Sequence, residues 1–206
     1  MDLVSSSPGG KPWAPVRLVV GLSEAMLACE KVLVSLLMAL VLGLILLNVV
    51  TRYTGMPLYW VDEAAVYAMV WLAFIGASAL TRLRLDFSVT LLSDKLSVSG
   101  ARRMKAFASL FGTAFALALG IMCWRWMDPL GIAAAGFDAK AYAGATFNFL
   151  YTEQTQTLRW PTWAVSLVIP IFAITMLVHG LANFLEDLGL APVKSRPDFD
   201  HAEGVN

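Results

Sequence analysis

Three charged residues at the border between two long apolar runs are the first candidates for chemistry in this sequence. Arg52 follows one uncharged run, and the adjacent carboxylates Asp62 and Glu63 open the next. A carboxylate in the first turn of a helix is stabilised by the positive helix end, by about 0.3–1 kcal/mol. The short connection places Arg52 within reach of either carboxylate, so the pattern predicts an ion pair that joins two helix ends. The alternative left open is that one carboxylate reaches a second subunit.

Catalytic, cofactor and metal sites have little support in the sequence. The two histidines, His179 and His201, fall on the same side of the expected membrane and cannot supply paired axial ligands to an embedded haem. The sequence contains no zinc-protease helix motif, nucleophile elbow or phosphate-binding glycine loop. No carboxylate lies well inside an apolar run, which argues against an ion path within the chain. We therefore expect a protein that is not an enzyme and that has no cofactor.

The elements that must position these charges are four long apolar segments. The chain has 206 residues, of which 58% are hydrophobic and 15% charged, a composition typical of membrane proteins. Because a helix needs about 20 residues to cross the hydrocarbon core, each segment is long enough to span it. The sequence therefore predicts an all-α membrane protein with four transmembrane helices, at about residues 30–51, 60–81, 106–127 and 161–183.

The distribution of positive charge predicts how the chain crosses the membrane. Eleven of the 15 Lys and Arg residues fall before the first segment, between the second and third, or after the fourth, against 4 in the other two connections. By the positive-inside rule, both termini are cytoplasmic. Five tryptophans at the opposite helix ends agree with this orientation. The net charge of zero gives no reason to expect a nucleic-acid partner.

The remaining segments divide the chain into an expected membrane domain and two flanking parts. Residues 1–15 are rich in Ser, Pro and Gly and are expected to be disordered, whereas 16–186 form the four-helix domain and 187–206 a polar cytoplasmic tail. Within the domain, 16–31 is interpreted as an extension of the first helix. Residues 90–96 have the pattern of a short amphipathic helix on the cytoplasmic membrane surface. The longest connection, 128–159, is expected on the outer side, against the membrane or a partner.

Two helix faces have patterns suited to close packing. On the second helix, Tyr67, Trp71 and Phe74 share one face below Glu63. On the third, small residues recur at every fourth position, and such stripes allow close approach of helices in lipid. Either face could pack inside the four-helix domain or against a neighbouring protein, and the sequence does not separate the two. The small residues are Ala108, Gly112, Ala116 and Gly120.

Together these patterns resemble the small permease (Q, DctQ-type) membrane subunit of tripartite ATP-independent periplasmic (TRAP) transporters, over roughly residues 30–186. The resemblance departs from the family at Val66 and Asp86, where members often carry arginine and histidine. The motifs that carry it are Asn48-Val49-Val50 with Arg52-Tyr53, then Trp60, Asp62-Glu63, Trp71, Phe74 and Gly76, and finally Leu158-Arg159-Trp160-Pro161-Thr162-Trp163 with Ile169-Pro170.

This resemblance implies a division of labour in a bacterial inner membrane. A large multi-helix permease subunit would carry the substrate and sodium sites, and a periplasmic binding protein would deliver a carboxylate-type substrate. The small subunit would enlarge the stationary scaffold, in contact with membrane lipids. The alternative is an independent four-helix membrane protein, either a small channel or a subunit of a membrane-bound enzyme.

Overall fold

The computed structural model describes residues 13–84 and 98–194, apart from the side chains of residues 98 and 102. Within these residues the chain is helical, and its one β feature is an isolated antiparallel bridge between Gln154 and Pro161. Four helices are long and apolar enough to cross a membrane, which confirms the predicted fold class. The helices are α1 (Ala14–Tyr53), α2 (Tyr59–Leu83), α4 (Val98–Met127), α5 (Pro129–Ala134), α6 (Ala139–Thr146), α7 (Thr162–Ser166) and α8 (Val168–Asp187).

Helix α1 is much longer than a membrane span requires. It runs without interruption for 40 residues, beginning well before the predicted start near residue 30. Two charged residues of its first half, Glu24 and Glu30, contact other helices. The segment 16–31 is therefore continuous with the first span. At about 1.5 Å per residue the helix is about 60 Å long.

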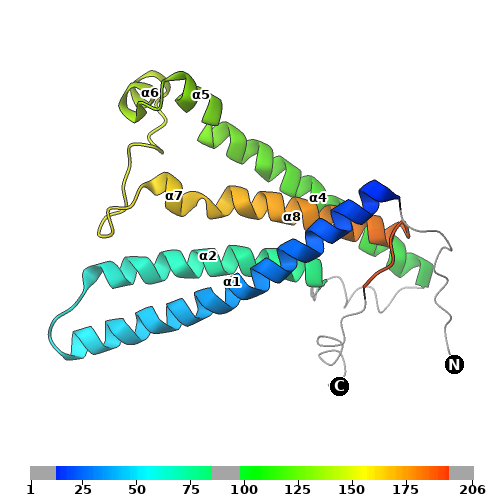
Figure 1. The fold of residues 1–206 in the computed structure, drawn as a ribbon, viewed down its shortest axis with the longest axis horizontal. Helices are drawn as coiled ribbons and strands as arrows, with labels where there is room; N and C mark the ends of the chain where they lie inside the picture. The colour runs from blue at the N-terminus through cyan, green and yellow to red at the C-terminus, as the bar shows by residue number, and fades with distance from the viewer. Residues whose placement is uncertain (1–12, 85–97, 195–206) are drawn as a thin grey trace.

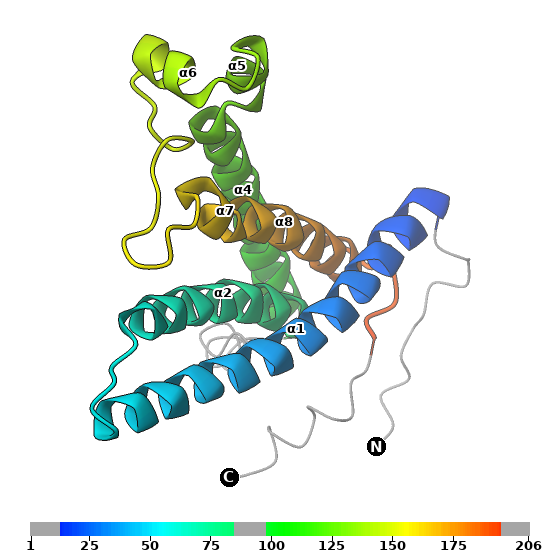
Figure 2. The same ribbon diagram turned by 60° about the vertical axis from the view of Figure 1, so that its left-hand side comes forward.

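The long helices form an open layer rather than a closed bundle (Figures 1 and 2). Helix α1 packs on α2 and crosses α8, α2 packs on α8, and α4 packs on α8. Both views show α4 diverging from the α1–α2 hairpin. We call the end where α1 begins and α8 ends the terminal end, and the opposite end the loop end. The loop end carries the α1–α2 turn and residues 128–161.

The last predicted helix is divided in two near its start. Helix α7 ends at Ser166 and α8 begins at Val168. Pro170 has no N–H to donate to the carbonyl of residue 166, so the regular ladder of hydrogen bonds is broken there. The ladder resumes with Ile171 N–H, which donates to the Leu167 carbonyl at 3.1 Å. The helix then continues to Asp187, four residues past its predicted end.

The long connection after α4 is folded. Asp128 follows α4 directly and caps α5, accepting a hydrogen bond from Gly131 N–H at 3.0 Å. Its other carboxylate oxygen accepts from the Tyr142 hydroxyl of α6 at 2.9 Å. The Tyr151 hydroxyl donates to the Met127 carbonyl at 2.6 Å, and so ties the end of this segment back to α4. Residues 128–151, which we call the platform, thus form a small structured unit at the loop end.

Some predictions fall on residues that the structure does not describe. They are the amphipathic helix at 90–96, most of the disordered N-terminus and residues 195–206 of the tail. The placement of both termini in the cytoplasm also stays a prediction.

Candidate functional site

The predicted arginine–carboxylate ion pair lies at the loop end, where α1 and α2 meet. The Arg52 guanidinium and the Asp62 carboxylate are 2.8 Å apart. Asn48 completes the junction, because its side-chain oxygen accepts from Arg52 Nε at 2.8 Å and its amide donates to Asp62. The Arg52 and Asp62 side chains are 60% and 47% exposed, so the pair contributes at most about 1 kcal/mol to stability. Its main effect is to fix the geometry of the α1–α2 turn.

Glu63 does not pair with Arg52 but holds the loop that leads into α7. Its carboxylate accepts hydrogen bonds from three consecutive backbone N–H groups, those of Gln156, Thr157 and Leu158, at 2.9, 2.7 and 2.8 Å. The Thr157 hydroxyl donates to the same carboxylate. The two adjacent carboxylates therefore have different partners within the chain. Asp62 joins α2 to α1. Glu63 joins α2 to residues 153–162, a hairpin closed by the Gln154–Pro161 bridge.

Removing the Glu63 carboxylate should release this hairpin. In Glu63→Ala the three amides lose their shared acceptor. We expect their hydrogen exchange to accelerate at least tenfold, which corresponds to a decrease of about 1.4 kcal/mol in the free energy of local opening. Exchange mass spectrometry of the purified chain in lipid nanodiscs would measure this for residues 156–158. Asp62→Asn is the matched control, since it removes the neighbouring charge and should leave these amides unchanged. Equal exchange in Glu63→Ala and the wild type would contradict the assignment.

The aromatic face of α2 packs inside the chain. The Trp71 indole donates to the Val165 carbonyl at 3.0 Å, and the Phe74 and Phe172 rings are 5.2 Å apart in an edge-to-face arrangement. The partner of the Trp71 N–H is thus a carbonyl of α7, just before the break between α7 and α8. Tyr67 and Gly76 are half-buried, and Trp60 is exposed at the start of α2.

The small residues of α4 are in different surroundings along the helix. Ala116 is fully buried, and a Cβ added to Gly120 would lie 4.0 Å from the Ala173 Cβ of α8. Gly112 has no atom within 4 Å of such a Cβ, and Ala108 is half-buried. The loop-end half of the stripe therefore packs against α8, as internal packing predicts. A Cβ added to Gly180 of α8 would be closer still to α4, at 2.6 Å from the Thr113 hydroxyl.

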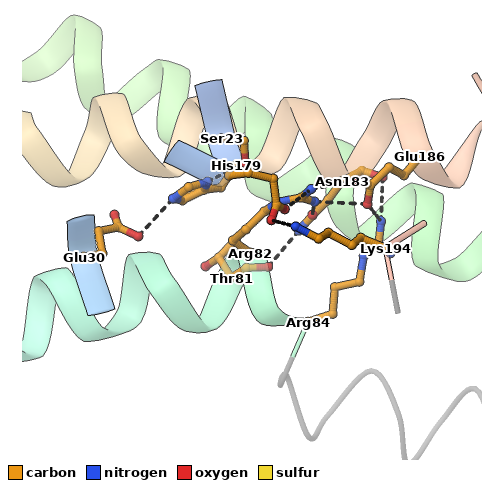
Figure 3. Close-up of polar contacts among 10 residues, drawn as sticks. Ser23, Glu30, Thr81, Arg82, Arg84, His179, Asn183, Glu186 and Lys194 are labelled. Atoms are coloured by element: carbon orange, nitrogen blue, oxygen red, sulfur yellow. Dashed lines mark hydrogen bonds and ion pairs between the residues drawn. The ribbon is translucent and has the colours of Figure 1, made fainter. Parts of the chain in front are cut away.

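A larger set of polar contacts lies at the terminal end, and we call it the polar seam (Figure 3). At its centre the Arg82 side chain of α2 is almost fully buried. It lies 2.7 Å from a carboxylate oxygen of Glu24 on α1 and 2.7 Å from one of Glu186 on α8. Arg82 also donates to the Asn183 side chain at 2.6 Å. One guanidinium thus joins three helices. The seam comprises Ser23, Glu24 and Glu30, then Thr81, Arg82 and Arg84, and finally His179, Asn183, Glu186, Asp187 and Lys194.

His179 attaches the first half of α1 to α8. Its ring is fully buried, with Nδ1 at 2.7 Å from the Ser23 hydroxyl and Nε2 at 3.0 Å from the Glu30 carboxylate. Ser23, Leu27 and Glu30 are the buried residues of α1, and they follow a helical spacing of four and three. Two of the three are polar, so this half of α1 is held by hydrogen bonds as much as by apolar packing.

The seam extends to α4 through Asp187. Its carboxylate is 2.6 Å from the Arg84 guanidinium and accepts from the Ser109 hydroxyl at 2.6 Å. Sequence reasoning missed the seam because its charges lie just beyond the uncharged runs, where charged side chains are usually solvated. A signal was present: Glu24, Arg82 and Glu186 lie near helix ends on the same side of the predicted topology, with opposite charges.

The contacts of these charged groups link one part of the chain to another. No cluster of three or more metal-ligating side chains occurs in the part of the chain that the structure describes. The carboxylates and cations of both junctions are paired with groups on neighbouring helices, which fixes where the helices lie. The fold is that of a helical, multi-span membrane protein, with four helices long and apolar enough to cross a membrane.

The family follows from comparison with known sequences. Residues 41–190 match the model for "Tripartite ATP-independent periplasmic transporters, DctQ component". The match covers most of the chain, which therefore belongs to this family and is a transporter component, as the sequence resemblance indicated. Searches of curated proteins and of solved structures gave no match.

Proposed function

We propose that this chain is the small scaffold subunit of a sodium-coupled TRAP transporter in a bacterial inner membrane. The observation that carries the proposal is the open layer of four spans, in which paired charges join α1 to α2 at the loop end and α2 to both α1 and α8 at the terminal end. An open layer offers two broad helical faces to a partner in the membrane. In the proposed orientation both termini and the polar seam are cytoplasmic, and the platform and the 153–162 hairpin are periplasmic.

The transport chemistry belongs to the other two components. The large multi-helix permease subunit carries the substrate and sodium sites, and the periplasmic binding protein delivers a carboxylate-type substrate. The small subunit supports the immobile part of the permease. The Arg52–Asp62 junction and the Glu63 contact set the loop-end geometry that the partner meets.

Purification of the complex tests the proposal directly. The tagged full-length chain would be extracted from its native membranes in mild detergent, and the proteins that accompany it identified by mass spectrometry. We expect a large multi-helix permease in stoichiometric amount. Recovery of the chain alone, or only with further copies of itself, would overturn the scaffold role and favour an independent channel. Recovery with a membrane-bound enzyme would favour the other alternative.

The loop-end charges should matter for assembly more than for folding. In Arg52→Ala combined with Glu63→Gln, the chain should still accumulate. The amount of co-purified permease and the rate of substrate uptake should both fall by about tenfold, which corresponds to a loss of about 1.4 kcal/mol in the free energy of association. The control is Arg125→Ala, which removes an exposed cation elsewhere at the loop end. If the double variant assembled and transported like the wild type, these charges would have no role in presenting the layer to its partner.

A further inference from the structure

The platform exposes an unusual number of large apolar side chains for its size. Leu130, Phe137, Phe147 and Phe149 are 68%, 75%, 82% and 51% exposed. The interior of the platform is filled by other residues, namely Ile132, Tyr142, Ala143 and Leu150. The exposed phenylalanines are therefore not needed for its core. Figures 1 and 2 show the platform helices α5 and α6 beside each other beyond the end of α4.

Two of these phenylalanines occupy backbone positions that favour glycine. Phe137 and Phe147 have φ angles of +61° and +57°, in the left-handed region that bulky side chains rarely adopt. Phe147 is the C-terminal cap of α6, a position where glycine or asparagine is the usual residue. Each phenylalanine thus combines an unfavourable backbone conformation with exposure of a large apolar ring. Such outliers persist where the side chain has a use.

The position of the platform indicates what covers these rings. Helix α5 begins at Pro129, two residues after α4 ends at Met127, so no spacer separates the platform from a membrane-spanning helix. Trp124 and Trp126 are exposed on the last turn of α4 and have the side chain typical of the membrane interface. The lipid-facing surface of α4 therefore continues into the exposed surface of the platform. Residues 128–151 carry only three charges, Asp128, Asp138 and Lys140.

We propose that the platform lies in the interfacial layer of the lipid bilayer, with Phe137 and Phe147 inserted at the boundary between headgroups and acyl chains. The proposal rests on the membrane-spanning fold and not on the subunit role. Apolar rings on a short helical unit of low charge bind such an interface by burying their area among the acyl chains. The contacts of Asp128 and Tyr151 with their neighbours hold the platform in shape, so the rings enter the lipid as a fixed set.

The depth of each ring can be measured in lipid. Phe137→Cys and Phe147→Cys would be made separately in the full-length chain with Cys29→Ser and Cys123→Ala. Each would be labelled with bimane, an apolar bicyclic group that stands in for the phenyl ring. The labelled chains would be placed in phosphatidylcholine–phosphatidylglycerol vesicles containing lipids brominated near the carbonyl end of the acyl chain. Glu153→Cys is the matched control, because it is an exposed position of the loop-end hairpin next to the platform.

We expect bromolipid quenching at positions 137 and 147 to be at least twice that at position 153. Quenching at either position no greater than at 153 would overturn the proposal. The proposal would also be overturned if the labels became shielded from solvent only when a purified periplasmic binding protein was added. That result would assign the exposed surface of the platform to a protein partner.

A second variant tests the rings without a label. The double variant Phe137→Ser with Phe147→Gly removes both rings. Glycine adopts the positive φ angle of position 147 without strain, so the variant should fold. In the same vesicles we expect the α6 amides of this variant to exchange at least fivefold faster than in the wild type. Unchanged exchange would overturn the proposal, because the platform would then be held without its rings.

Discussion

Replacing Arg82 with methionine should destabilise the chain more than any other single change at the helix junctions. The substitution removes the cation that Glu24 and Glu186 both contact at 2.7 Å, and leaves Glu186 with Arg84 at 3.2 Å and Glu24 with Lys194 at 3.1 Å. Breaking a buried ion pair by removing one partner costs about 3–5 kcal/mol. The longer contacts that remain to Glu186 and Glu24 should place Arg82→Met in the lower part of that range. Three helices meet at this guanidinium, so the loss should separate α1 from α8 as well as from α2. We expect little folded protein to accumulate.

Thermal unfolding of the purified full-length chain in nanodiscs would measure this effect, with accumulation in membranes as a second readout. Arg125→Met is the matched control, since Arg125 is exposed at the loop end and its loss should change stability by less than about 0.5 kcal/mol. Arg82→Lys should lie between the two, because lysine keeps the charge but not the planar fork of donors. If Arg82→Met melted like the wild type, the seam would not hold the helices together.

Enlarging Gly180 should have the second-largest effect, because this residue of α8 packs directly against Thr113 of α4. A Cβ at this position would lie 2.6 Å from the Thr113 hydroxyl and 3.3 Å from the Thr113 Cα. The hydroxyl can rotate, but the backbone of α4 cannot yield without moving the helix. Overpacking of this kind costs about 1–3 kcal/mol, and Gly180→Leu should reach the upper part of that range. In lipid, close packing is a main source of helix association, so α4 should detach from α8.

The comparison that isolates this effect uses a second glycine of the same helix pair. Gly112→Ala adds a Cβ that meets no atom within 4 Å, so it should be neutral or stabilise the helix by up to about 1 kcal/mol. Unfolding temperatures of Gly180→Ala, Gly180→Leu and Gly112→Ala in nanodiscs would give the ranking. Thr113→Ala should partly rescue Gly180→Ala by removing the hydroxyl at 2.6 Å. Equal stability of the two alanine variants would show that the contact is not tight.

The four spans could be predicted because each contains a long run without charge, and lipid permits few alternatives to a helix there. The extension of the first helix over 16–31 was predicted and is present in α1. The contacts that hold it were not predicted, because Glu24 and Glu30 look like solvated residues in the sequence. They are contact residues, and the partners that explain them, Arg82 and His179, lie far away along the chain. The break before α8 is local and could have been predicted from Pro170.

The loop-end charges also show that contacts between distant parts of the chain are hard to predict from sequence. Arg52 and Asp62 are close in sequence across a short turn, so their ion pair could be predicted. Glu63 was grouped with Asp62 because the two are adjacent, yet its partners are 93 to 95 residues away. No local pattern encodes that contact. Hydrophobic periodicity predicts which helices exist, whereas the polar contacts that fix their relative positions depend on the tertiary fold.

The length of α1 gives it the mechanical properties of a lever. Its attachment to α8 is centred near Leu27, with about 20 Å of helix on the side of Ala14 and about 40 Å on the side of Tyr53. If the uninterrupted helix turned rigidly about this attachment, a sideways movement of about 4 Å at the α1–α2 turn would correspond to an opposite movement of about 2 Å at its beginning. The hydrogen bonds of Ser23 and Glu30 with His179 would lie at the pivot point of such a movement. A displacement at one end of α1 would then be reversed and halved at the other.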